Sequence, residues 1–271
     1  MKHKGIILIS TVTVFILATV LSLVWLFKIR HVEISVVAEV SQEIETYEKV
    51  NAVIEANYKG KSFFSVSEDD VKAKLCQDPY LNVKSVKKVF PDRLQIEVSK
   101  RKERFAFSYN SEYYVTDSEY YLLKKVTSED QLGEGIIKIF LEQITIDVET
   151  LVLGQKIGAE NGALVGYMTE IFSRFSDGLN LIEGVTVMGA KNWIRFNTKT
   201  GVVIEFSFSP SNPTVSEGEQ SAEATALVGK ASEVESAYHG LSEYQKRNGY
   251  LLVYTKANGE IAIEHVTEHA V

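Results

Sequence analysis

The sequence predicts an α+β protein with an N-terminal transmembrane helix, a small domain of three strands and two helices, and a mixed β-domain with helices and a C-terminal hairpin. Three observations carry this prediction. Residues 5–27 contain no charged side chain, and residues 32–99 follow a β-α-α-β-β order. Residues 100–271 contain many short strand patterns and a final Asn-Gly turn. Helices and strands in separate runs are typical of the α+β class.

The uncharged run Gly5–Phe27 is long enough to cross a membrane. Its 23 residues would form a helix about 34 Å long, at about 1.5 Å per residue, against a hydrocarbon core of about 30 Å. A cleaved signal peptide is the alternative, but its apolar core usually has about 7–15 residues and small residues follow it. Here Trp25, Leu26 and Phe27 close the run, so the sequence favours an uncleaved anchor.

Charges beside the run only weakly orient it. Lys2 and Lys4 precede it, and Lys28 and Arg30 follow it, so only the α-amine favours a cytoplasmic N-terminus at residues 1–4.

Of the 29 basic residues, 25 lie beyond these flanks, together with all 36 acidic residues. The extramembrane part therefore carries a net charge of −11 and is expected not to bind nucleic acid, which needs a basic face.

The first domain shows one strand, two helices and two more strands in order. Residues 32–37 alternate as a strand, and Tyr47, Val50, Ile54 and Tyr58 share one face of a helix over 44–58. Ser67 is the expected N-cap of a second helix, with Val71 and Leu75 inward. Runs 83–90 and 94–109 are predicted to form strands around a Pro91-Asp92 turn.

Cys76 is the only cysteine, so an intramolecular disulfide is excluded, and its side chain is expected to be buried.

The second region contains more strands and two long helical patterns. Strands are expected at 113–116, 120–123, 136–141, 181–188, 193–196 and 202–208, and a helix at 162–175. Residues 209–221 are rich in Ser, Pro, Glu and Gly and are expected to form a mobile loop. One long helix is predicted over 222–247, with Leu227, Ala231, Val234, Tyr238 and Leu241 on one stripe. The chain ends in a hairpin, 250–256 and 260–266, around Asn258-Gly259.

Three short matches imitate a serine acyl-transfer enzyme of the penicillin-recognising type. They are Ser85-Val86-Lys87-Lys88, Ser108-Tyr109-Asn110 and Lys199-Thr200-Gly201. The serine of such an S-x-x-K motif must start a helix. Ser85 instead lies in a strand pattern, which would place the Ser85 and Lys88 side chains on opposite faces of the strand. Lys199-Thr200-Gly201 fits a hairpin turn. A membrane-anchored extracytoplasmic enzyme of this type remains the alternative to a non-catalytic protein.

Metal and anion sites have weak support. His265 and His269 are four residues apart, as in a helical metal pair, but they lie in a strand pattern and a tail. Lys100-Arg101-Lys102-Glu103-Arg104 reads as a charged strand edge, or as a contact for an acidic partner. We expect no metal, no cofactor and no catalytic residue.

The anchor and the first domain resemble one known family. The resembling stretches are Gly60–Val66, Val71–Leu75 with Pro79, and Val83–Val98 with its Phe90-Pro91 turn, followed by Tyr113–Asp117. In these stretches the chain is similar to the FtsQ/DivIB cell-division proteins, whose β-α-α-β-β unit is a POTRA domain. Residues 100–106 lack the proline that this family carries there, so the chain resembles a divergent member.

The resemblance implies a non-catalytic scaffold at the division septum. It implies a single-pass type II protein of the plasma membrane, with an extracytoplasmic domain that binds small bitopic partners of the FtsL and FtsB/DivIC kind and so regulates septal wall synthesis. A secretion or sensor component with the same small domain is a further alternative.

The family's usual contact is strand addition at the C-terminal hairpin, where a partner segment pairs with a sheet edge. On this basis Tyr254, Lys256, Ile261 and Ile263 are the predicted partner-binding residues. The alternative for Ile261 and Ile263 is that their side chains face the core.

Overall fold

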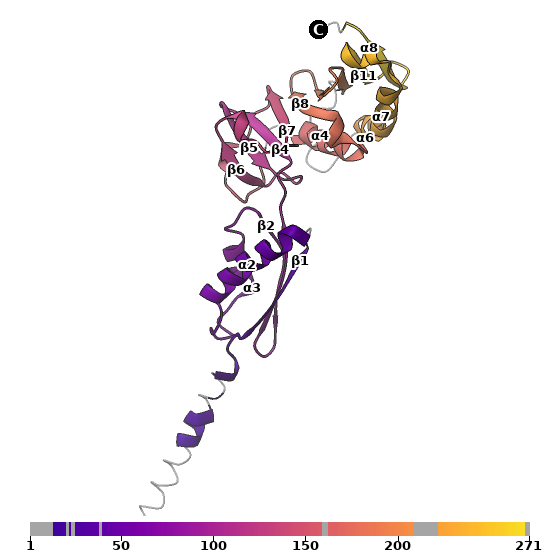
Figure 1. The fold of residues 1–271 in the computed structure, drawn as a ribbon. Helices are drawn as coiled ribbons and strands as arrows, with labels where there is room; N and C mark the ends of the chain where they lie inside the picture. The colour runs from indigo at the N-terminus through magenta and orange to yellow at the C-terminus, as the bar shows by residue number, and fades with distance from the viewer. Residues whose placement is uncertain are drawn as a thin grey trace, which may run out of the picture. The chain divides into compact units, whose positions relative to one another are not determined.

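The computed structural model describes residues 13–19, 22, 25–37, 40–158, 162–208 and 222–268. Within these ranges no helix is both long and apolar enough to cross a bilayer. Most of the predicted span 5–27 lies outside the described residues, as do residues 1–4 and the predicted loop 209–221. The chain divides into two compact units between Arg101 and Lys102 (Figure 1).

The first unit is a three-stranded sheet covered by two helices. Its elements are β1 (His31–Val37), α2 (Val40–Asn57), α3 (Glu68–Leu75), β2 (Leu81–Val89) and β3 (Arg93–Lys100). The central strand β3 pairs in parallel with β1 and antiparallel with β2. The observed order β-α-α-β-β and the α+β class are as the sequence predicts.

Apolar periodicity explains why α2 and α3 cover the same sheet. Both helices bury residues four apart, a spacing that places side chains on one face of a helix. Buried strand residues alternate with more exposed ones in β3. The resulting core contains Val50, Ile54, Tyr58, Val71, Leu75, Leu81, Val83, Val86, Leu94, Ile96 and Val98.

Two helix residues lie elsewhere than predicted. Tyr47 is 43% exposed, and Thr46 is buried in its place, because the inner face of α2 runs through residues 46, 50 and 54. Cys76 is exposed, not buried. It is the C-cap of α3, about 100° around the helix from the buried Leu75, so its thiol leaves the apolar stripe.

The predicted strand 94–109 is also wrong as one element. β3 ends at Lys100 and β4 (Phe105–Tyr109) begins after four residues, three of them basic. The Arg101 N–H donates to the Tyr80 carbonyl at 2.8 Å, whereas the Arg104 N–H donates to Thr116 at 2.8 Å. The chain therefore leaves the first sheet and joins the second between these residues.

The second unit is built on a nine-stranded sheet of order β12-β11-β10-β9-β8-β7-β4-β5-β6. Most neighbouring strands are antiparallel, but β4 with β7, β7 with β8 and β10 with β11 are parallel. The strands are β4, β5 (Glu112–Thr116), β6 (Leu122–Val126), β7 (Ile137–Glu142), β8 (Ile182–Met188), β9 (Trp193–Thr198), β10 (Val203–Ser207), β11 (Tyr250–Thr255) and β12 (Ile261–Val266). The helices are α4 (Gly162–Arg174), α5 (Gly178–Leu181), α6 (Ala222–Gly229), α7 (Ala231–Gly240) and α8 (Glu243–Arg247).

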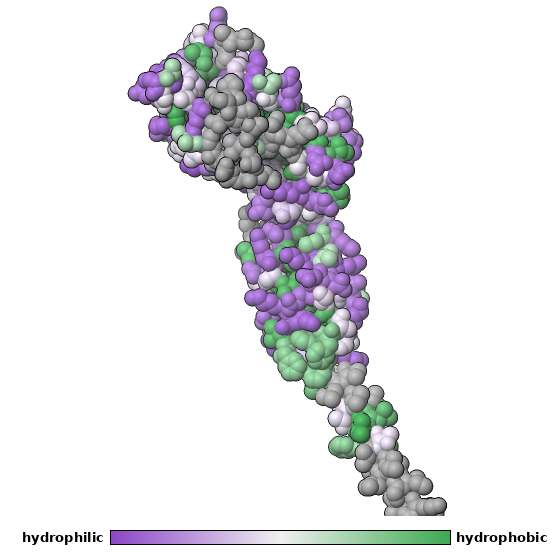
Figure 2. Space-filling model, turned by 180° about the vertical axis from the view of Figure 1, so that it is seen from behind, coloured by the Kyte–Doolittle hydropathy of each residue, from purple (hydrophilic) through white to green (hydrophobic). Residues whose placement is uncertain are grey.

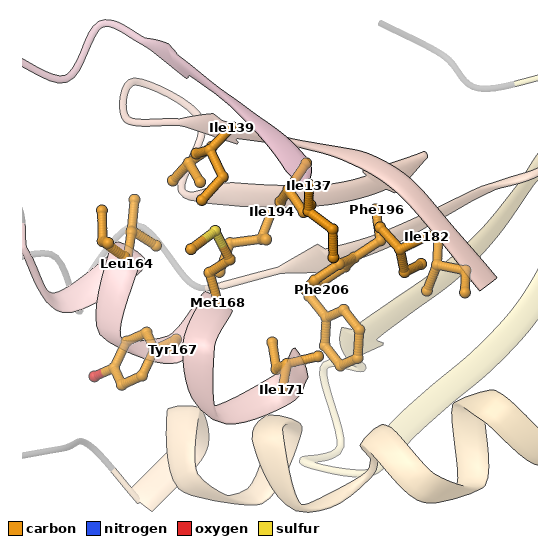
Figure 3. Packing of buried hydrophobic residues seen from close by; sticks show 14 of the residues in the cluster. Ile137, Ile139, Leu164, Tyr167, Met168, Ile171, Ile182, Ile194, Phe196 and Phe206 are labelled. Carbon is orange, nitrogen blue, oxygen red and sulfur yellow. The ribbon is translucent and has the colours of Figure 1, made fainter. Parts of the chain in front are cut away.

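Helix α4 packs its apolar face on the centre of this sheet. Figure 3 shows Leu164, Met168 and Ile171 on the side of this helix that faces residues of β7, β9 and β10. Phe196 and Phe206 are fully buried, with ring centroids 5.9 Å apart at an interplanar angle of 77°, an edge-to-face contact that aromatic rings favour. The labelled core residues are Ile137, Ile139, Leu164, Tyr167, Met168, Ile171, Ile182, Ile194, Phe196 and Phe206.

The predicted helix 222–247 is instead three helices. α7 ends at Gly240, and Leu241 is extended. Ser242 then caps α8: its hydroxyl accepts from the Gln245 N–H, and the Gln245 side chain accepts from the Ser242 N–H. This reciprocal capping box stabilises the N-terminus of α8 as a separate helix. The predicted stripe is nevertheless buried at Leu227, Ala231, Val234 and Tyr238.

Glu235 of α7 holds the start of α5 in place. Its carboxylate, 6% exposed, accepts hydrogen bonds from the Ser176 N–H at 2.8 Å, the Ser176 hydroxyl at 2.9 Å and the Asp177 N–H at 3.0 Å. Burial raises the pKa of Glu235, but these hydrogen bonds outweigh burial and lower the pKa below its ordinary value of 4.5. Glu235 is therefore a stabilising anion in the folded state.

Replacing Glu235 by Gln is expected to lower the free energy of unfolding near neutral pH by about 1–3 kcal/mol, because an amide cannot accept all three bonds. A depressed pKa stabilises the fold above the unfolded-state value, and this stabilisation is lost as pH falls through the folded-state pKa. Denaturant unfolding of wild type and Glu235→Gln at several pH values should therefore give curves that converge in acid. Glu233→Gln, which removes an exposed ion pair with Lys230, is the matched control. Parallel curves for wild type and Glu235→Gln would contradict the assignment.

Candidate partner-binding edge

The C-terminal hairpin closes through the predicted Asn258-Gly259 turn. Gly259 has φ +87°, which glycine adopts without strain. The Asn258 side chain accepts from the Glu260 N–H at 3.1 Å. The Lys256 N–H donates to the Glu260 carbonyl at 2.8 Å, and the Gly259 N–H donates to the Lys256 carbonyl at 2.9 Å. The turn fixes the register in which Tyr254 lies opposite Ala262.

The connection through α6, α7 and α8 places β12 at an edge of the sheet. β11 returns in parallel beside β10, and β12 then folds back antiparallel on its far side. β12 is the last strand in the order. Within the described part of the chain, no strand pairs with its outer side.

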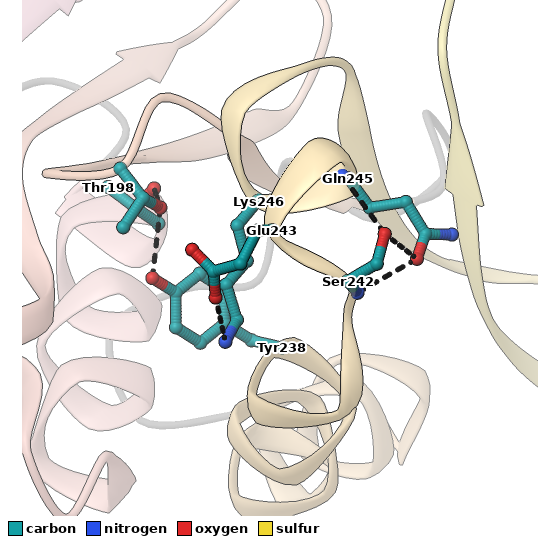
Figure 4. Close-up of polar contacts among 7 residues, drawn as sticks. Thr198, Tyr238, Ser242, Glu243, Gln245 and Lys246 are labelled. Atoms are coloured by element: carbon teal, nitrogen blue, oxygen red, sulfur yellow. Dashed lines mark hydrogen bonds and ion pairs between the residues drawn. The ribbon is translucent and has the colours of Figure 1, made fainter.

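The β9–β10 turn contacts helices α7 and α8, which precede the hairpin (Figure 4). The Thr200 and Tyr238 hydroxyls are 2.9 Å apart, and the Val202 N–H donates to the Lys246 carbonyl at 2.8 Å. The ion pair of Lys246 with Glu243 spans 3.4 Å. The segment Lys199-Thr200-Gly201 thus makes a structural turn, with Gly201 at φ +117°.

Two residues fix β12 against the start of β11. Gly249 has φ +89°, and a Cβ there would lie 2.1 Å from the Val266 carbonyl oxygen. The Nε2 atom of His265 lies 2.9 Å from the Asn248 carbonyl oxygen and 3.3 Å from that of Gln245. The hairpin is therefore attached closely to the preceding loop.

The four predicted partner-binding residues lie on two faces of the hairpin. Ile261 and Ile263 are half-buried and pack against the main core, on the same face as Val253. Tyr254 and Lys256 lie on the opposite face, and both contact Glu264. The structure brings the four residues together on one hairpin; their role in binding stays a prediction.

Glu264 links the polar side chains on the outer face. Its carboxylate accepts from the Tyr254 hydroxyl at 3.1 Å and pairs with the Lys256 ammonium at 3.2 Å. These contacts raise the pKa of Tyr254 and the pKa of Lys256. Both groups therefore stay protonated at neutral pH, and Tyr254, Lys256 and Glu264 form a charged group on the outer face of the hairpin.

Backbone alternation shows which groups of β12 face outward. Antiparallel strands alternate residues bonded to the partner with residues whose N–H and C=O point away. Because Lys256 bonds to Glu260, the inward set of β12 continues through Ala262, Glu264 and Val266. The N–H and C=O groups of Ile261, Ile263 and His265 therefore point to the free edge.

The opposite edge of the sheet is partly covered. Residues 154–157 lie along the start of β6, where the Leu122 N–H donates to Gln155 at 2.8 Å and the Gly154 N–H donates to Leu122 at 2.8 Å. Ile157 likewise donates to Tyr120 at 2.9 Å. A native cover of this kind blocks added strands, so among the described residues β12 is the more accessible edge of this sheet.

The other candidate motifs have structural positions. Ser85 lies in strand β2, near Glu97 at 3.5 Å. Lys88 lies on the other face of β2, where its ammonium donates to the carbonyls of Phe63 and Val66 at 3.0 and 2.8 Å. The opposed orientation predicted for Ser85 and Lys88 is thus observed.

Of the two histidines at the spacing of a helical metal pair, His265 lies in β12 and His269 lies outside the described residues. In the described ranges no three His, Cys, Asp or Glu side chains gather in a group that could hold a metal ion.

The sequence predicted strand addition at the C-terminal hairpin but did not identify β12 as the edge strand or His265 as an attachment point. The alternation and the Asn-Gly turn predict a hairpin. They carry no information on strand order, which depends on the crossover from β10 to β11.

The architecture of the first unit defines its class. Two helices on one face of a three-stranded sheet in the order β-α-α-β-β make it a POTRA domain. Residues 27–101 match the family model described as POTRA domain, FtsQ-type. This match confirms, over the first unit, the resemblance seen in the sequence. No curated protein matches the chain significantly.

Proposed function

We propose that this protein is a non-catalytic, membrane-anchored scaffold of the bacterial division septum. Residues 5–27 would anchor it in the plasma membrane, with residues 1–4 in the cytoplasm and both units outside. It would bind small bitopic division proteins of the FtsL and FtsB/DivIC kind and so regulate septal wall synthesis. The FtsQ-type POTRA match over residues 27–101 supports a division-related role.

The observation that carries the binding mode is the outer edge of β12, with which no strand pairs in the part of the chain that the structure describes. Ile261, Ile263 and His265 offer three N–H and three C=O groups along about 13–14 Å, at about 3.3 Å per residue. A segment of about five residues in extended conformation can pair with them. Main-chain hydrogen bonds then supply affinity without requiring a particular sequence.

The two faces of the hairpin define the sequence that the partner needs. Residues of an added strand beside Ile261 and Ile263 would extend the apolar face of the sheet. The residue between them would lie beside Ala262, and the next residue on that face would lie beside Glu264. The partner segment should therefore alternate apolar and polar residues, because cross-strand neighbours on one face stabilise a sheet.

The function is tested by purifying the tagged full-length chain from membranes and identifying the proteins retained. The expected result is recovery of small single-pass division proteins that contain an alternating segment of this kind. The matched control carries Val37→Asp, an exposed position in the POTRA unit away from the hairpin, and should retain them. Recovery of no division protein by the wild-type chain would overturn the proposal.

A further inference from the structure

Four phenylalanine rings gather at one end of the POTRA unit, outside its main core. Ring centroids of Phe27 lie 5.3 Å from both Phe64 and Phe90, and those of Phe63 lie 5.7 Å from Phe64 and 6.0 Å from Phe90. We call these four residues the aromatic cluster. They come from the segment before β1, the α2–α3 link and the β2–β3 turn, which all meet at this end.

The cluster is open to solvent on one side. Phe64 is 67% exposed and Phe90 65% exposed, whereas Phe63 beneath them is 8% exposed. Trp25 and Leu26, which precede Phe27, are also exposed. Figure 2 shows a hydrophobic group at this end of a largely hydrophilic unit. A contiguous exposed apolar patch of this kind marks an interaction surface.

The backbone holds this surface rigidly. The Phe63 N–H donates to the Phe27 carbonyl at 2.7 Å, the Ile29 N–H to the Lys61 carbonyl at 2.9 Å, and the Gly60 N–H to the Ile29 carbonyl at 2.8 Å. Ile29 is fully buried in the POTRA core. The segment that follows the uncharged run is thus paired to the domain and is not a free linker.

The neighbouring sequence favours a lipid bilayer as the binding partner of the aromatic cluster. Phe27 is both a member of the cluster and the last residue of the uncharged run 5–27. Cationic side chains adjoin it at Lys28, Arg30 and Lys61, in a chain of net charge −7. The Arg30 guanidinium lies 3.9 Å from the Trp25 ring centroid. Aromatic rings with basic neighbours, directly after an apolar run, suit the boundary between acyl chains and anionic headgroups.

We propose that the aromatic cluster inserts into the interfacial layer of the phospholipid bilayer, so that the POTRA unit is seated on the membrane surface. Phe64 and Phe90 are the inserted rings, and Lys28, Arg30 and Lys61 face lipid phosphates. This inference rests on the proposed membrane anchoring and concerns a surface other than the β12 edge. It gives the first unit a fixed position relative to the bilayer.

The test measures the depth of single spin labels in the full-length chain, reconstituted in vesicles of phosphatidylglycerol and phosphatidylethanolamine. Labels are attached at Phe64→Cys, Phe90→Cys or Val37→Cys in a Cys76→Ser background. Val37 is the matched control: it is 61% exposed at the other end of β1, about 20 Å from His31 at about 3.3 Å per residue. Labels at 64 and 90 should show at least threefold higher ratios of oxygen to nickel-chelate accessibility than the label at 37.

The alternative outcomes are distinct. A chain that floats with the vesicles but gives equal ratios at all three positions overturns insertion and leaves the anchor intact. Dipolar broadening between labels at position 64 of different chains assigns the cluster to a second copy and also overturns insertion. A chain that does not float with the vesicles overturns both the anchored function and the insertion.

Discussion

Replacing Ile263 by Pro should reduce partner binding at least tenfold, or by about 1.4 kcal/mol. The Ile263 N–H points to the free edge of β12, so proline removes a donor offered to the partner and places its ring where an added strand would lie. Proline is tolerated on an edge strand when its missing N–H faces outward. The hairpin should therefore remain folded while binding is lost. Titration of the full-length variant with the purified partner measures the effect.

Two further variants separate the backbone from the side chain. Ile263→Ala removes the same half-buried apolar side chain but keeps the outward N–H, and should bind more tightly than Ile263→Pro. Ala262→Pro removes an inward N–H, so it should destabilise the pairing of β11 with β12. Equal binding by Ile263→Pro and Ile263→Ala would show that strand addition at this edge is not the binding mode.

Replacing Gly249 by Ala should destabilise the second unit by about 3 kcal/mol or more. A positive φ costs an ordinary residue about 1–3 kcal/mol, and at Gly249 the added methyl would lie 2.1 Å from a backbone oxygen and 3.0 Å from the Thr267 Cα. Backbone atoms on both sides must then shift, which pulls β12 away from the start of β11. Thermal and denaturant unfolding of the variant measure the loss.

Gly259→Ala is the matched control for this effect. Gly259 has a similar φ of +87°, but nothing lies within 4 Å of an added Cβ. It should cost about 1–2 kcal/mol, from backbone strain alone. Equal losses for Gly249→Ala and Gly259→Ala would contradict the close attachment of the hairpin to the preceding loop.

The sequence predicted local elements well where two signals coincided. The hairpin had both alternation and an Asn-Gly turn, and both are observed. Ser67 is the N-cap residue of the second POTRA helix as predicted, but its side chain makes no capping hydrogen bond. The predicted helix over 222–247 was wrong because its apolar stripe continues across the break. The capping residues Ser242 and Gln245 were the overlooked signal.

The position of β12 at the edge of the sheet could not be predicted in the same way. Which strand lies outermost depends on β11 joining β10 in parallel, a long-range choice made by packing of α6 and α7 on the sheet. The core-facing position of Ile261 and Ile263 was one of two alternatives that alternation alone could not separate. Likewise, the aromatic cluster brings together Phe27 and Phe90, which are more than 60 positions apart in the sequence.

The most direct test of strand addition is residue-resolved hydrogen exchange of the β12 amides in the full-length chain, with and without the copurified partner. Strand addition predicts slower exchange at Ile261, Ile263 and His265 when the partner is bound, with little change at Ala262, Glu264 and Val266. Protection that is absent from β12, or that does not alternate along it, would contradict pairing of a partner strand with this edge.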